Sequence, residues 1–230
     1  MRVRRSRGAA NGRAPCVRGA LRVTETLLAA LLTLFVVVDP VGVAVTYAAM
    51  SHAHPPAENQ RMAIKGVAVA TGILVLFYFA GRPLLAALGI GIDAFRIAGG
   101  ILLFVLALDM VLVRPSGLRT TTDAEAAEAA HKADLSVFPL AFPLLAGPGA
   151  ITTVILMATG SGHGVPAPMA LTVIALVMGG TLAALVAATR LARLLGETGA
   201  NVVTRLLGLL LAALAVQFVL DGVRGGLALS

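Results

Sequence analysis

Asp39-Pro40-Val41-Gly42 interrupts an apolar run, residues 27–50, that is long enough to cross a lipid bilayer. Asp39 stands 12 residues after the start of that run. At the rise of an α-helix this is roughly 18 Å, near the middle of a hydrocarbon core about 30 Å thick. A charge at this depth costs roughly 2.5–3.5 kcal/mol on insertion scales, and the proline breaks the helix. We therefore expect this stretch to have a role that offsets its cost.

The composition indicates a polytopic membrane protein. Of the 230 residues, 58% are hydrophobic and 13% are charged, whereas soluble domains are about 45–50% apolar and about 25% charged. Such long apolar runs must satisfy their backbone hydrogen bonds internally, so an all-α fold is expected. The single cysteine, Cys16, excludes an intrachain disulfide. The histidines show no metal-ligand spacing beyond His52-x-His54, so no metal or cofactor is expected.

Six apolar runs predict six transmembrane helices. They are residues 27–50, 63–81, 95–113, 135–159, 169–189 and 202–223. Arg82-Pro83 is expected to end the second and Arg114-Pro115 the third, whereas Pro139, Pro143 and Pro148 break the fourth. Most glycines inside the spans are expected to let helices approach each other closely.

The chain divides into four parts. They are a basic disordered tail (1–26), a first three-helix unit (27–113), a polar connecting loop (114–134) and a second three-helix unit (135–230). The tail could be a signal peptide, a nucleic-acid-binding arm or an extension outside the translated protein. Asp39-Pro40 directly after the apolar stretch argues against a signal peptide, and no nucleic-acid partner is expected.

The two halves match each other. At an offset of 108 residues Asp39-Pro40 falls on Gly147-Pro148, Gly72 on Gly180, Arg82 on Arg190 and Gly91 on Gly199, and after a one-residue insertion Arg96-x-x-Gly99 falls on Arg205-x-x-Gly208. Because each unit has an odd number of spans, the second enters the membrane from the opposite side. Inverted repeats with breaks in corresponding helices are the signature of secondary transporters.

The break at Asp39-Pro40 has two interpretations that stay open here. Pro40 has no N–H to donate to the carbonyl of Val36, and Pro148 has none for Leu144. In the structural interpretation, Asp39 is the N-cap of a second half-helix that starts at Pro40. In the functional one, the half-helix N-termini attract a substrate carboxylate, and the freed carbonyls accept an ammonium group or a cation.

A small zwitterion matches both ends of such a site. The predicted substrate-binding residues lie at the two breaks and one turn beyond the second; they are Asp39, Pro40, Gly42, Gly147, Pro148, Gly149, Thr152 and Thr153. Asp39 could instead carry a coupling proton, since burial raises the pKa of a carboxyl group. The sequence does not indicate whether a coupling ion, proton or sodium, is used.

Other polar residues in or near the spans are weaker candidates. Asp93 and Arg96 are three residues apart on one helix face and are expected to pair locally. Asp109 and Gln217 lie deep in the third and sixth spans and could line a pathway, although Asp109 is close enough to the span end to reach the interface. Arg205 is the repeat partner of Arg96 and is a structural or pathway candidate.

Several motifs resemble the MarC family of bacterial integral membrane proteins. They are Asp39-Pro40-Val41-Gly42, the stretch from Phe95 to Leu102, the proline-rich stretch from Pro139 to Ile151, and Asn201-Val202-Val203-Thr204-Arg205. The resemblance covers residues 27–227 and implies six spans in the plasma membrane. The family is named after a multiple-antibiotic-resistance locus, is classed among neutral amino acid transporters and is grouped with LysE-type exporters.

This chain departs from the family in its basic tail, because the family usually begins a few residues before the first span. The family also accepts Asn at the position of Asp39. Asn can cap a helix but cannot carry a proton, which favours the capping role. The expected function is transport of small solutes, with neutral amino acids first. The alternative is a non-transporting assembly or regulatory subunit.

An enzyme is not expected, because no H-E-x-x-H or G-x-S-x-G motif is present. The loops opposite the termini hold eight basic residues, and the terminal side holds three besides the tail. Basic loops stay in the cytoplasm, so both termini are expected outside the plasma membrane. The sequence does not indicate the oligomeric state.

Overall fold

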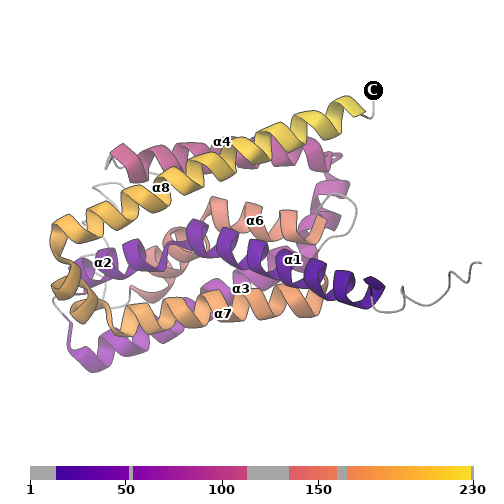
Figure 1. Cartoon of the computed structure of the whole chain (residues 1–230). Helices are drawn as coiled ribbons and strands as arrows, with labels where there is room; N and C mark the ends of the chain where they lie inside the picture. Colours follow the sequence, from indigo (N-terminus) through magenta and orange to yellow (C-terminus); the bar gives the residue numbers. More distant parts are fainter. Residues whose placement is uncertain (1–13, 52–53, 113–134, 160–164, 229–230) are drawn as a thin grey trace, which may run out of the picture.

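The computed structural model describes residues 14–51, 54–112, 135–159 and 165–228, and within these the secondary structure is entirely helical (Figure 1). The elements are α1 (Ala14–Val38), α2 (Pro40–Met50), α3 (Pro56–Ala87), α4 (Ile92–Leu112), the π-helix η1 (Ser136–Leu145), α6 (Pro148–Thr159), α7 (Ala167–Val186) and α8 (Ala188–Ala228). The expected polar loop, 114–134, lies outside the described residues.

The all-α prediction is confirmed. In the described part of the chain, five helices are long and apolar enough to cross a membrane: Thr24–Met50, Pro56–Ala87, Ile92–Leu112, Ala167–Val186 and Asn201–Leu227. A sixth candidate span is the pair η1 and α6, which is bent by 58°. The chain is therefore a multi-pass helical membrane protein with five to six spans.

Two of the expected boundaries were wrong. The second span does not end at Arg82-Pro83, because α3 continues through Pro83 to Ala87. Pro83 lies near the end of α3, where a missing N–H removes one hydrogen bond without disturbing the helix core. The tail is not disordered throughout, because α1 begins at Ala14. Pro15 falls in the first turn of α1, where proline is tolerated.

The helices form three layers, with the two interrupted spans in the middle. Figure 1 shows α1–α2 and η1–α6 between a layer of α4 with α8 and a layer of α3 with α7. In agreement, α3 packs on η1, α6 and α7, whereas α4 packs on α6 and most extensively on α8. The middle layer supplies much of the apolar core; Leu34, Val38, Val43, Leu145 and Val154 are fully buried.

The glycines inside the spans fall into two groups. A Cβ on Gly100 would lie 2.8 Å from the carbonyl oxygen of Ala215, and one on Gly208 would lie 2.7 Å from Met110, so these glycines let α4 and α8 approach closely. Gly72 and Gly180, in contrast, have no such neighbour within 4 Å. The expected close packing therefore holds for the α4–α8 contact and is wrong for Gly72 and Gly180.

Candidate functional site

The first break is one residue wide. Asp39 separates α1 from α2 with φ 49° and ψ 69°, the left-handed conformation, which Asp tolerates better than most residues. Its Oδ1 accepts a hydrogen bond from the N–H of Gly42 at 3.0 Å. The backbone N–H of Asp39 donates to Phe35, and its carbonyl accepts from Val43. Asp39 is thus the N-cap of α2, with Pro40 in the first turn, and the capping prediction is confirmed.

Gly42 serves this cap. A Cβ at position 42 would overlap Oδ2 of Asp39, so only glycine lets the carboxylate lie over the first turn of α2. Asp39 itself is 1% exposed. The carboxylate is therefore held inside the bundle, where a group without hydrogen bonds would be costly.

The second break is longer and is made by backbone geometry. Phe138 and Phe142 are extended inside η1, because each precedes a proline and the helical conformation is disfavoured there. The N–H of Leu140 donates to Leu135, and that of Ala146 donates to Ala141, so these bonds span five residues, as in a π-helix. A new α-helix, α6, then starts at Pro148.

Gly147 is required at this turn. A Cβ on Gly147 would overlap the backbone carbonyl of Pro143. The carbonyl of Gly147 accepts the N–H of Ile151 at 3.0 Å, which starts the hydrogen-bond pattern of α6. The chain therefore bends by 58° from η1 into α6 at a glycine whose surroundings leave no room for a side chain.

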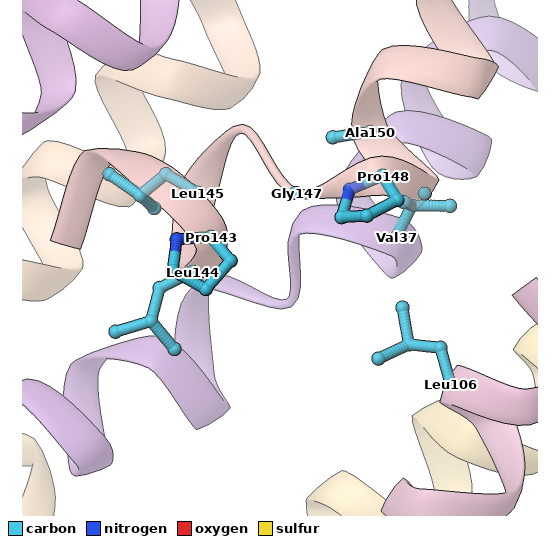
Figure 2. Close-up of a pocket in the computed structure, with 9 residues that line it drawn as sticks. Val37, Leu106, Pro143, Leu144, Leu145, Gly147, Pro148 and Ala150 are labelled. Carbon is cyan, nitrogen blue, oxygen red and sulfur yellow. The ribbon is translucent and has the colours of Figure 1, made fainter. Parts of the chain in front are cut away.

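The two breaks lie next to each other. A Cβ on Gly149, at the start of α6, would lie 3.3 Å from Val37 and 2.8 Å from Leu103 of α4. Val37 belongs to the last turn of α1, two residues before Asp39. Figure 2 shows Pro148 beside Val37, with Leu106 of α4 across the gap. The structure thus brings together the two interruptions that lie 108 residues apart in the sequence.

A small crevice opens at this meeting point. It has a free volume of about 20 Å³ and is lined by Val37, Leu106, Pro143, Leu144, Leu145, Gly147, Pro148, Gly149 and Ala150. A water molecule needs roughly 10–15 Å³ measured in this way, so the crevice holds about one water. An amino acid does not fit without movement of the surrounding helices.

Three of the predicted substrate-binding residues line this crevice: Gly147, Pro148 and Gly149. Thr152 and Thr153 are buried in α6 beyond it. The Thr153 hydroxyl donates to the carbonyl of Gly149 at 2.8 Å, and the Thr152 methyl packs where Gly99 has no side chain. Thr152 therefore supports the packing of α6 against α4, whereas the Thr153 hydroxyl bonds within α6 itself. Their contact with a substrate stays a prediction.

The other polar candidates are spread over the fold. Arg96 is buried and its Nη1 lies 3.4 Å from Oδ1 of Asp93, so the local pair is confirmed. Arg205 and Gln217 are exposed on α8, and Asp109 is half-buried on α4. The structure does not gather these side chains around the crevice. Sequence reasoning missed Val37 and Leu106, because apolar residues of a span carry no signal that separates lining from packing.

The apolar helices and the two adjacent interruptions define an integral membrane protein that crosses the bilayer several times. The chain belongs to the MarC family, because the profile described as "MarC family integral membrane protein" matches residues 24–227. It is 36% identical over 205 residues to a UPF0056 membrane protein of Methanocaldococcus jannaschii, covering 88% of this chain and 98% of the relative.

Two relatives from Escherichia coli strain K12 are similar over nearly the same region. The UPF0056 inner membrane protein YhgN is 32% identical over 200 residues, covering 86% of this chain and 96% of the relative. The UPF0056 membrane protein YhcE is 37% identical over 197 residues, covering 84% of this chain and 89% of the relative. No solved structure matches the chain.

Proposed function

We propose that this protein transports small solutes across the plasma membrane, with neutral amino acids such as alanine and glycine as the leading class. The observation that carries this proposal is that two interrupted spans occupy the middle layer, and that one crevice is lined by the second break and by Val37, two residues before the first break. Secondary transporters bind substrate and coupling ion at such discontinuous helices near the bilayer midplane. The classification of the MarC family among neutral amino acid transporters, and its grouping with LysE-type exporters, agree with this class.

The two breaks supply opposite chemistry. Gly149 and Ala150 belong to the first turn of α6, whose N–H groups have no acceptor within a helix, and both residues line the crevice. This helix end suits a substrate carboxylate. At the other break, the carboxylate of Asp39 accepts the N–H of Gly42 and lies outside the residues that line the crevice. In the proposed mechanism its negative charge suits an ammonium group once the helices separate. A zwitterion with its two charges one carbon apart matches this polarity.

We further propose that the fold is a 3+3 inverted repeat that works by alternating access. The proposal pairs α1–α2 with η1–α6, α3 with α7, and α4 with α8. If the two halves are exchanged, the contact of α3 with η1–α6 corresponds to a contact of α7 with α1–α2. Both contacts are present in the structure. Likewise, the contact of α4 with α6 corresponds to that of α8 with α2. This symmetric packing supports the proposal, because repeats related by a two-fold axis must share their contacts.

In this mechanism the crevice corresponds to a closed state. A substrate enters only when Val37 and Leu106 separate from the start of α6, which requires a relative movement of the two halves. Movement of one repeat against the other around a fixed site is the general form of alternating access.

Counterflow of labelled alanine into liposomes tests the function. Liposomes with the purified protein and unlabelled alanine inside should accumulate external label above protein-free liposomes. Gly72→Ala is the matched control, because that position has open space and the variant should keep full counterflow. If none of the neutral amino acids gives counterflow while the protein stays folded and monodisperse, a non-transporting assembly or regulatory subunit is the better explanation.

We also propose that both termini lie outside the cell. The start of α1 and the end of α8 lie at the same end of the bundle (Figure 1). Arg61 and Lys65 near the start of α3, and Arg190 and Arg193 near the start of α8, are exposed and belong to the opposite end. Basic residues favour the cytoplasmic side, so the opposite end is assigned to the cytoplasm.

A C-terminal reporter that is active only in the cytoplasm should therefore stay silent. Activity in the full-length protein, but not in a version starting at Val23, would mean that the basic tail sets the orientation. Activity in both would contradict the argument from the loops.

A further inference from the structure

Three polar residues form a row on the outer face of α8. Gln217, Asp221 and Arg224 follow each other at helical spacings of four and three. Nε2 of Gln217 donates to Oδ1 of Asp221 at 2.8 Å, and Nη1 of Arg224 lies 4.0 Å from the same oxygen. Gln217 is exposed, and the side chains of Asp221 and Arg224 are 43% and 75% exposed. We call these residues the α8 polar row.

The α8 polar row faces away from the rest of the bundle. The opposite face of α8 packs on α4, where Gly208 meets Met110 and Gly222 meets Ile97. Gln217 is nine residues after Gly208, which at 3.6 residues per turn places it half a turn around the helix. In the most apolar 18-residue stretch of the α8 span only 22% is buried, against 39% in the corresponding stretch of each of the other four candidate spans, Thr24–Met50 included.

The depth of the α8 polar row makes this exposure costly. The span Asn201–Leu227 has its middle near residue 214. Gln217 is then roughly 5 Å and Asp221 roughly 10 Å from the bilayer centre, inside a hydrocarbon half-thickness of about 15 Å. Ionisable residues within membrane helices almost always face the bundle interior or pair with one another. The outward faces of α3 and α7 carry apolar residues instead, such as Leu76 and Leu176.

We propose that the α8 polar row is the interface through which two copies of this chain associate in the membrane. A two-fold axis along the membrane normal brings Gln217 of both copies to the same depth. The bond to Asp221 uses one amide N–H, and the amide also carries a second N–H and a carbonyl oxygen, so Gln217 is complementary to itself. Ala213, one turn before Gln217 and also exposed, is small enough to let the two α8 helices approach closely.

The charges of the α8 polar row also favour a second copy of this chain as the partner. Asp221 and Arg224 are opposite in sign and adjacent on the helix, so a parallel second copy presents an arginine near each aspartate. Lipid chains offer no such donor or acceptor. A second copy therefore satisfies the amide and the charge pair together, independently of what the protein transports.

Cysteine cross-linking in native membranes tests the interface. In a Cys16→Ser background, Ala213→Cys and Gln217→Cys should each give a disulfide-linked dimer on mild oxidation. Leu176→Cys is the matched control, because it is 59% exposed on α7 and should stay monomeric. Equal cross-linking at Leu176 would overturn the proposal, as would cross-linking of the α8 cysteines to a different membrane protein.

The strength of association gives a second readout. The monomer–dimer equilibrium in liposomes, measured by single-molecule photobleaching over a range of protein densities, should shift toward monomer in Gln217→Leu by about 3- to 20-fold. Leucine suits lipid, so this variant should insert and fold, and Leu176→Ala should leave the equilibrium unchanged. A wild-type protein that stays monomeric at all densities, or a Gln217→Leu dimer of unchanged strength, would overturn the proposal.

Discussion

The two breaks meet one requirement by different means. Each stops a helix inside an apolar span and starts another, which exposes backbone groups that lipid cannot satisfy. At the first break the side chain of Asp39 caps the new helix, and α1 and α2 together still form one candidate span, Thr24–Met50. At the second, the backbone of η1 and the bare Gly147 make the turn, and the pair bends by 58°.

This difference indicates which amino-acid substitutions each break should tolerate. The first depends on one acceptor atom, so it should tolerate any side chain that supplies that atom. The second depends on the absence of a side chain next to a backbone carbonyl, so even a methyl group should disturb it. Substitutions at the two sites can therefore separate a cap from a substrate site.

Asp39→Leu should have the largest effect. It leaves the N–H of Gly42 buried without its acceptor and places leucine in a left-handed conformation, a combined cost of about 2–5 kcal/mol. Transport should be lost and the thermal unfolding temperature should fall. Asp39→Asn, which keeps an acceptor, should retain most transport and stability. If Asn is as inactive as Leu in a folded protein, Asp39 carries charge in the mechanism and the capping explanation of its role is incomplete.

Gly147→Ala should come next. The added methyl overlaps the carbonyl of Pro143, which is backbone and yields only if the turn moves, so a cost of about 1–3 kcal/mol is expected. Counterflow should fall along with stability. Gly180→Ala, at a position in α7 with no neighbour within 4 Å, is the control and should have no effect. Normal stability and transport in Gly147→Ala would show that the second break is not held by this turn.

Gly42→Ala should have a smaller effect than Gly147→Ala. Its methyl meets the carboxylate of Asp39, which is a side chain and can rotate away at the loss of one cap hydrogen bond, about 0.5–1.5 kcal/mol. Thermal unfolding of the two variants in the same detergent measures the difference. A larger loss in Gly42→Ala would reverse the comparison between the breaks.

Thr153→Val should have the smallest effect on stability. Valine keeps the shape and removes one hydroxyl that bonds within its own helix, so a change of about 1 kcal/mol or less is expected. Counterflow of alanine then decides the role of the hydroxyl. Full activity assigns Thr153 to packing, whereas a strong loss with unchanged stability assigns it to the substrate.

Local chemistry was predictable from the sequence, and non-local placement was not. Asp39 followed by proline indicates a cap, and Asp93 with Arg96 indicates a pair, because all partners lie within one helical turn. The repeat offset also aligned the breaks. The π-helical form of η1 was not predicted, because the prolines indicate that Phe138 and Phe142 are extended but not that the residues between them form hydrogen bonds five residues apart.

What the sequence failed to predict was mainly which face of each helix packs against its neighbours. Gln217 was a pathway candidate because of its depth, but depth does not show which face of α8 packs on α4. Val37 and Leu106 line the crevice because of tertiary contacts between α1, α4 and α6. Apolar residues on every face of a buried helix leave such contacts without a sequence pattern.

Each half of the chain packs mainly against the other half and not within itself, and this arrangement also bears on biogenesis. In the described part of the chain, all the extensive contacts of α1, α2, α3 and α4 are with η1, α6, α7 or α8. We therefore expect the first half to enter the bilayer as separate helices, because its partners are synthesised later. On this expectation, membrane insertion and tertiary assembly are distinct stages, and Asp39 becomes buried only when the second half packs against the first.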